Sequence, residues 1–305
     1  MVQEREYEIA GGSLYYEPFG EKGLCIIGFR GLAGEVEIPE QIEGIPVTAI
    51  GRKAFLSKKH LRKVTVPACV SEVGDWAFAY CDNLREVVFL APQQQETFKS
   101  ALRFGKAVFL ECGSLQFIYV QKEDAATAAL MAAAVTTADA PYLLDAAEAG
   151  EKEWLEKWDA RLLAILGSAD DEGYSRQVLC GEEDYGSTDL AAYENAQRKR
   201  KVRLLFLRRM YDKGLNPQLC RRMEDYLLTH TKGCEHEETW QVVLQEHGDD
   251  RAYYELFAEL GCVTAENFED LLLEVGEDYP ELRAYLMRYK EARLGYRDFF
   301  AGLDL

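Results

Sequence analysis

The stretch IGRKAF at residues 50–55 decides the fold, because it returns twice further along the chain. It is matched by VGDWAF at 73–78 and by FGKAVF at 104–109, so that the shared glycine recurs after 23 and then 31 residues. The longer interval contains an insert of eight residues at about 91–98. A unit that repeats in this way must stack on its neighbours to bury its apolar face. The sequence therefore predicts a solenoid.

Apolar residues downstream of each glycine keep the same spacing in all three copies. A partial fourth copy lies upstream, at Val36 and Ile38. Because alternate residues of a strand point to opposite faces, we expect these side chains to face the core. The glycine should permit a tight turn before the Ala-Phe pair, which we expect on the convex side. The equivalent apolar positions are Leu61, Leu84 and Leu115; Val64, Val87 and Ile118; and Val66, Phe89 and Val120.

The residues between these inward positions should line the concave face of the solenoid. Along the repeats this face changes from acidic to aromatic. Two interpretations of Phe117 and Tyr119 stay open: they pack against the domain that follows, or they form an aromatic patch that binds a partner. The predicted partner-binding residues are Glu35, Glu37, Lys63, Thr65, Glu86, Val88, Phe117 and Tyr119.

Three quoted segments carry a family resemblance. The stretches IPEQIEGIPVTAIGRKAF (38–55), VPACVSEVGDWAFAYCDNL (66–84) and FGKAVFLECGSLQFIYV (104–120) resemble BspA-type leucine-rich repeats, and the resemblance covers residues 24–120. It implies an adhesion or protein-interaction module of a kind that is frequently exposed on a surface. Upstream, YEIAGGSLYYEP and LCIIGFRG alternate apolar and polar residues around glycine turns, so we expect β-hairpins that cap the first repeat.

After residue 124 the pattern becomes helical. Residues 125–149 contain twelve alanines, and apolar residues then recur with helical spacing in segments of 10 to 16 residues. Short helices in series suggest an α-solenoid or a weakly ankyrin-like stack. The predicted fold class is thus an α+β repeat protein, with a leucine-rich-repeat β-solenoid and its hairpin cap at 1–121 and an all-helical domain at 122–305.

Charge and cysteine usage indicate the compartment and disfavour some partners. The net charge is −18, of which −16 falls in residues 122–305, so binding to nucleic acid or to an anionic membrane is not expected. The N-terminal sequence MVQEREYEIAGG lacks the apolar segment of a secretory signal. The eight cysteines form no CxxC pair, which fits reduced thiols. From these features we expect a cytoplasmic bacterial protein.

A basic segment interrupts the acidic second half. Residues 198–222 contain ten basic residues and one acid, Asp212. Three interpretations stay open: pairing with acids of the same domain or a solvated face, binding of an acidic protein, and a nucleic-acid or regulatory adaptor that uses the helix 198–209. The basic patch consists of Arg198, Lys199, Arg200, Lys201 and Arg203.

Motifs for catalysis are missing from the sequence. It contains no phosphate-binding loop, dinucleotide fingerprint, GxSxG elbow or HExxH motif. His230, Cys234 and His236 are close in sequence but have no second ligand pair, so we expect a polar turn rather than a zinc site. We therefore predict no catalytic residue, metal or cofactor, and a scaffold that binds an unknown protein partner. The alternative is a hydrolase or transferase with an interdomain site.

Overall fold

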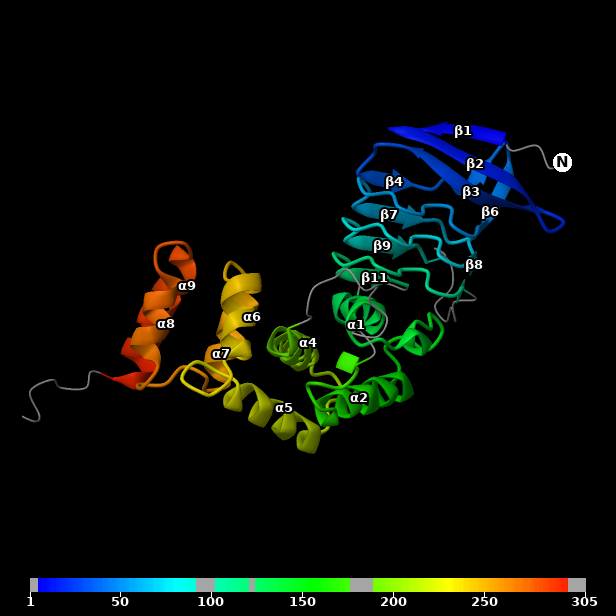
Figure 1. The fold of residues 1–305 in the computed structure, drawn as a ribbon. Coiled ribbons are helices and arrows are strands. Elements are labelled where there is room, and N and C mark those ends of the chain that lie inside the picture. Colours follow the sequence, from blue (N-terminus) through cyan, green and yellow to red (C-terminus); the bar gives the residue numbers. More distant parts are fainter. Residues whose placement is uncertain (1–4, 92–101, 121–123, 176–188, 296–305) are drawn as a thin grey trace, which may run out of the picture. The chain divides into compact units, whose positions relative to one another are not determined.

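The computed structural model of the protein describes residues 5–91, 102–120, 124–175 and 189–295 (Figure 1). The chain divides into two compact units, Met1–Leu162 and Leu163–Leu305. The first unit contains the strands, and the described residues of the second are helical. Apart from its first residue, the insert at 91–98 lies outside the described residues.

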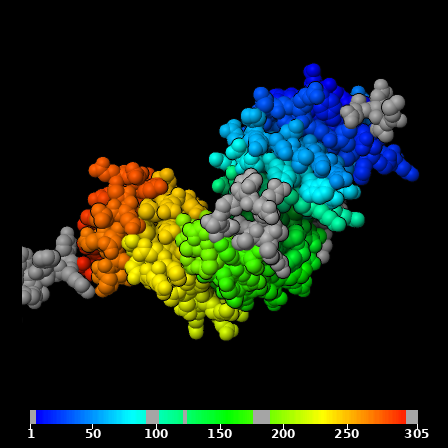
Figure 2. All heavy atoms as spheres, in the orientation of Figure 1, coloured from blue at the N-terminus to red at the C-terminus, as the bar shows by residue number. Residues whose placement is uncertain are grey.

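Two sheets form the solenoid of the first unit. One sheet has the strand order β1-β2-β3-β6-β8-β10, with β5 against β6, and the other has the order β11-β9-β7-β4. In the space-filling view the residues of this region, blue to cyan, form one closely packed body (Figure 2). The strands are β1 (Arg5–Ile9), β2 (Gly12–Phe19), β3 (Gly23–Gly31), β4 (Glu35–Glu37), β5 (Gln41–Ile42), β6 (Ile45–Ile50), β7 (Lys63–Val66), β8 (Glu72–Val73), β9 (Glu86–Phe89), β10 (Arg103–Phe104) and β11 (Phe117–Tyr119).

The predicted repeat register is confirmed. All three strand pairs of the four-stranded sheet are parallel, as stacking of successive coils requires. Their central residues lie side by side, and each is at most 2% exposed. The other predicted inward positions are also buried. The central row consists of Val36, Val64, Val87 and Ile118.

The repeated glycine has a different role from the one we predicted. A Cβ atom on Gly74 would lie 2.6 Å from the backbone nitrogen of Arg52 in the preceding coil. The left-handed conformation instead falls two residues after each glycine, where φ is 61° at Lys53, 54° at Trp76 and 49° at Ala107. The glycine is therefore required for close stacking between coils rather than for the turn itself.

Buried aromatic rings stack from coil to coil. Phe55 and Phe78 lie 5.1 Å apart between ring centroids, and Phe78 and Phe109 lie 5.6 Å apart. Phe55 and Phe78 are fully buried, so the phenylalanines of the Ala-Phe pairs are part of the core. The thiol of Cys81 donates to the Phe55 carbonyl at 3.0 Å, which confirms that this cysteine packs inside the repeat.

An antiparallel cap precedes the first coil. β1 pairs with β2 and β2 with β3, both antiparallel, and β3 then pairs in parallel with β6 of the repeats. The β1–β2 turn is made by Gly11 (φ 80°), whose added Cβ would meet the side chain of Ala33 at 2.8 Å. The cap thus extends one of the two sheets.

Helices complete the first unit. α1 (Ala125–Thr136) packs against β11 and buries most of its alanines, which allow close approach. The 3₁₀ turn η1 (Pro141–Leu143) follows, and α2 (Lys152–Gly167) comes next. The indole of Trp158 donates to the Leu130 carbonyl at 3.2 Å, which ties α2 to α1. These contacts explain why the compact unit extends to Leu162 although the composition changes near residue 121, where the domain boundary stays a prediction.

The second unit is built on α4. α4 contacts α5, α6 and α7, while α9 contacts α7 and α8. Trp240, Phe206 and Phe257 are among its buried residues. The mixed α+β class with a helical C-terminal region is confirmed, and the likeness to ankyrin repeats stays a prediction. The helices are α4 (Leu190–Met210), α5 (Pro217–Thr229), α6 (Glu238–His247), α7 (Arg251–Glu259), α8 (Phe268–Val275), α9 (Pro280–Tyr289) and the π-helical η2 (Lys290–Leu294).

Candidate functional site

The eight residues predicted to line one face of the solenoid form two rows across the four-stranded sheet. The strand register sets the members of each row directly opposite one another. All eight are exposed or half-buried, whereas the residues between them are buried. One row is Glu35, Lys63, Glu86 and Phe117, and the other is Glu37, Thr65, Val88 and Tyr119.

An ion pair crosses the middle of this sheet face. The ammonium of Lys63 lies 2.6 Å from the Oε1 atom of Glu86 on the adjacent strand. The hydrogen bond to Glu86 raises the pKa of Lys63, and the nearby Glu35 acts in the same direction. Charge therefore alternates along the row from Glu35 to Lys63 to Glu86.

Aromatic rings occupy the other end of the face. Phe117 and Tyr119 stack with their centroids 5.7 Å apart, and both stay half-buried. Burial raises the pKa of the Tyr119 phenol, and the carboxylate of Glu86 raises it further. α1 packs against β11 without covering these two rings completely.

A groove lies at the acidic end of the face. Its volume is about 1240 Å³. One wall is formed by β1 and the residue after it, Tyr7–Ala10, and another by β4 and the following residues, Glu35–Glu40. Lys63 and Thr65 also line it. The contribution of β1 left no signal in the sequence, because it depends on contacts between distant segments.

The predicted basic patch does not form one exposed surface. Arg198 and Lys201 are only 8% and 5% exposed. The Nε atom of Arg198 lies 2.7 Å from Glu238 Oε1, and Lys201 Nζ lies 2.7 Å from Asp170 Oδ1. These two basic residues are therefore held by acids of the same unit and are not available to an external ligand in this arrangement.

The other three basic residues also have partners close by. Arg203 donates two hydrogen bonds of 2.7 Å to the carboxylate of Glu246, and Lys199 donates to Gln245 at 3.1 Å. Arg200 bonds to Gln197 at 3.4 Å. These contacts agree with the interpretation in which the segment pairs within its own domain.

A buried polar cluster surrounds Glu238, which the sequence analysis missed. Glu238 is 2% exposed, and its Oε1 atom accepts hydrogen bonds from Arg198 and Asn195. Its Oε2 atom has no hydrogen-bond partner among the described residues. The cluster shows the geometry of a structural ion network, since one carboxylate oxygen holds two helices together.

The turn predicted from His230, Cys234 and His236 is polar and partly stacked. His230 lies against Tyr226, with ring centroids 3.9 Å apart, and burial lowers the pKa of its imidazole. Within the described ranges, no group of three or more His, Cys, Asp or Glu residues is arranged to hold a metal ion. Likewise, none of the helices described here has the length and apolar character needed to cross a membrane.

Comparisons with known proteins bear on the repeat region. The family model for the BspA type leucine rich repeat region matches residues 35–126, in six copies. No curated protein matches the chain.

Several solved structures have similar parts. A leucine rich cell surface protein from Faecalibacterium prausnitzii is 23% identical over 38% of this chain and 32% of its own, with a TM-score of 0.30. A leucine rich repeat protein from T. pallidum is 27% identical over 36% of this chain and 58% of its own, with a TM-score of 0.26. A leucine-rich repeat protein from Bacteroides capillosus is 21% identical over 39% of this chain and 99% of its own, with a TM-score of 0.25. This chain thus spans less than two thirds of the first two.

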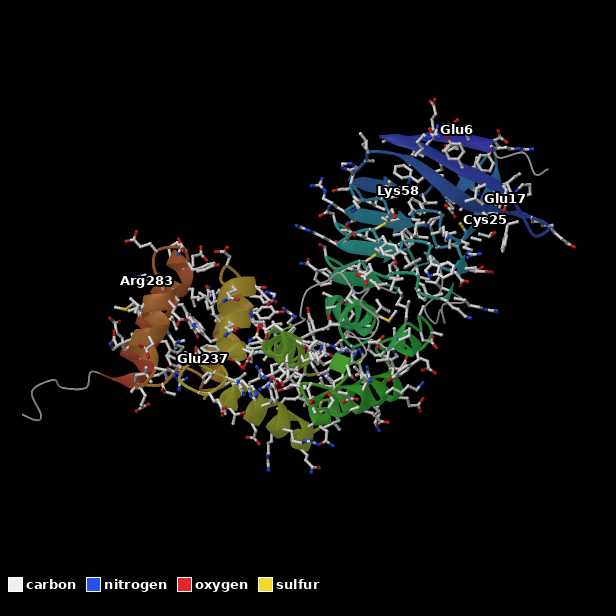
Figure 3. The ribbon with its side chains drawn as sticks, viewed as in Figure 1. Glu6, Glu17, Cys25, Lys58, Glu237 and Arg283 are labelled. Atoms are coloured by element: carbon white, nitrogen blue, oxygen red, sulfur yellow. The ribbon has the colours of Figure 1, made fainter. Side chains whose placement is uncertain are left out.

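The predicted cytoplasmic location is wrong on these findings. The matched repeat is of the BspA type, and the similar protein from F. prausnitzii is described as a cell surface protein. The cysteines misled the prediction for a physical reason. Cys25 lies among the cap strands (Figure 3), and burial raises the pKa of its thiol to about 12, so it serves as a core residue in any compartment. Residues 35–126 of this chain match the family model of the BspA type leucine rich repeat region.

Proposed function

We propose that the protein is a non-catalytic scaffold that binds a protein partner through the exposed face of its four-stranded sheet. The observation that carries the proposal is the pair of cross-strand rows, in which eight side chains of mixed chemistry stand on one accessible, regular surface. Rigid neighbouring strands hold such side chains at fixed spacing, so little ordering is needed on binding.

The chemistry of the face suits a protein surface. Its middle combines the Lys63–Glu86 pair with the half-buried Thr65 and Val88, and its far end carries the stacked rings of Phe117 and Tyr119. Aromatic anchors beside polar groups are typical of residues that dominate binding energy at protein interfaces. A partner would cover the rings of Phe117 and Tyr119 and form polar contacts with the charged side chains beside them.

The experiment compares two arginine substitutions in the full chain. Val88→Arg places a long cation in the middle of the face, and Leu110→Arg makes the same kind of change at a residue that is 40% exposed outside the four-stranded sheet. Both variants should melt close to the unmodified protein. In affinity capture from the native bacterium with quantitative mass spectrometry, the same partner should be retained by the Leu110 variant and reduced at least about tenfold by the Val88 variant. Equal capture by both variants would reject the face.

A further inference from the structure

The two sheets of the solenoid end at different levels on the N-terminal side. β3 stacks in parallel on β6, and β2 and β1 extend that sheet further (Figure 1). The four-stranded sheet instead stops at β4, with no further strand among the residues described. The groove of about 1240 Å³ lies at this step, because Tyr7–Ala10 and Glu35–Glu37 both line it.

One edge of the β4 backbone pairs with no strand in the part of the chain that the structure describes. Gly34 accepts hydrogen bonds from Arg62 and Lys63, and Ile38 donates to Thr65 at 2.9 Å, so alternate residues of this segment turn their backbone groups toward β7. In a parallel ladder the intervening residues turn theirs the other way. The N–H and C=O groups of Glu35 and Glu37 therefore point off the edge, and both residues are exposed. Such an edge can accept an added strand.

The side chains at this edge specify the charge of the added strand. The row across the sheet runs Glu35, Lys63, Glu86, and its last two members already form a 2.6 Å ion pair across neighbouring strands. A cation placed on the open side of Glu35 would repeat that geometry. Glu37 offers a second carboxylate two residues further on, while Glu8 and Glu40 add negative charge to the groove lining.

We propose that the open edge of β4 binds an extended basic segment of the partner as a fifth strand, with lysine or arginine opposite Glu35 and Glu37. The inference rests on the proposed function, for which it names the segment of the partner that is recognised. An added strand of about four to six residues would fit beside β4, where the four-stranded sheet ends. A second copy of this chain fits poorly, because pairing two β4 edges would set glutamates against glutamates.

The first test uses peptides and the unmodified full chain. A fluorescent octapeptide of alternating lysine and valine should bind at least about tenfold more tightly than the glutamate–valine analogue, as measured by anisotropy. Two further lysine–valine peptides carry N-methyl groups on alternate residues, so that each lacks the donors of one strand edge. One of them should lose binding and the other should keep it. Equal binding by both N-methylated peptides would overturn strand addition.

The second test alters the protein at Glu37. Glu37→Gln and Glu37→Pro both remove the carboxylate, but only Glu37→Pro also removes the outward N–H. Proline is tolerated at a strand edge whose N–H faces solvent, and circular dichroism checks that the variant is folded. The glutamine variant should bind the lysine–valine peptide about two- to fivefold more weakly than the unmodified protein does. The proline variant should bind it about fivefold more weakly than the glutamine variant does. Identical affinities for the two variants would show that the backbone edge is not used.

The two proposals fail in distinguishable ways. If Val88→Arg loses the native partner but the peptides bind without edge dependence, the face binds a partner and strand addition is wrong. If Val88→Arg keeps the native partner while the two Glu37 variants differ in lysine–valine affinity, the edge is a peptide site and the proposed face is wrong.

Discussion

Lys63 and Glu86 lie directly opposite each other on β7 and β9, and their charged atoms are 2.6 Å apart. On the other side of Lys63, the register sets Glu35 opposite it on β4. One lysine thus separates two carboxylates in a single row. Because the Lys63 side chain is 41% exposed, solvent screens much of this interaction.

The first prediction follows from this row. Lys63→Glu should leave the protein folded but lower its free energy of unfolding by about 1 kcal/mol, because a carboxylate then faces carboxylates on both sides. Lys63→Gln should cost less. The measurement is urea unfolding at low salt and in 1 M NaCl, where the difference between the two variants should shrink. A difference that is unchanged by salt would rule out this electrostatic explanation.

The second prediction concerns the stacking glycine. Gly74→Ala should destabilise the first unit by about 1–3 kcal/mol, because its Cβ would sit 2.6 Å from the Arg52 backbone nitrogen. Gly113→Ala is the matched control in the same unit, since no atom lies within 4 Å of an added Cβ there. Thermal melting of both variants checks this. Similar melting temperatures would mean that the coils can separate without cost.

The sequence predicted the buried positions of the repeat correctly, but not the role of its repeated glycine. Periodic apolar residues such as Val64 and Val87 follow from strand alternation, a local rule, and their burial was predicted correctly. The close approach of Gly74 to Arg52 links successive coils, so a turn within one coil was the simpler interpretation.

The candidate site also combines features that follow from local strand alternation with features that depend on contacts between distant segments. Strand alternation was enough to place Glu35 and Thr65 on one face, whereas the wall at Tyr7–Ala10 depends on how the cap folds back. In the second unit, Arg198 pairs with acids that are 28 and 40 residues away, Asp170 and Glu238. No periodic pattern joins residues at such separations, which is why an exposed basic patch remained one of the interpretations.

The third prediction tests that buried network. Arg198→Met should destabilise the second unit by about 3–5 kcal/mol, because it leaves Glu238, which is 2% exposed, without its cationic partner. Arg203 lies on the same helix, and its ion pair with Glu246 is more exposed. Arg203→Met should therefore lower the free energy of unfolding by less than about 1 kcal/mol. Chemical denaturation measures both. Equal losses would contradict a structural role that is special to Arg198.

The last prediction is a pH dependence of the second unit. His247 stacks on Tyr253 with ring centroids 3.5 Å apart, and burial lowers the pKa of its imidazole below 6.5 despite the nearby Glu246 and Asp250. Burial likewise lowers the pKa of His230. Below pH about 6.5 the unfolded chain takes up protons on these histidines before the folded protein does, so protonation favours unfolding. The stabilisation is present above that pH and is lost as the pH falls toward the folded-state pKa values.

Thermal melting between pH 7.5 and 5.5 measures this dependence, in a range above the ordinary pKa values of carboxyl groups. The melting temperature of the unmodified protein should fall on acidification. His247→Phe keeps an aromatic ring against Tyr253 and removes the proton site, so its melting temperature should fall less over the same range. Adding His230→Phe should flatten the profile further. A protein that melts at a higher temperature at pH 5.5 than at pH 7.5 would contradict the sign, because it would require histidines that prefer the charged form when folded.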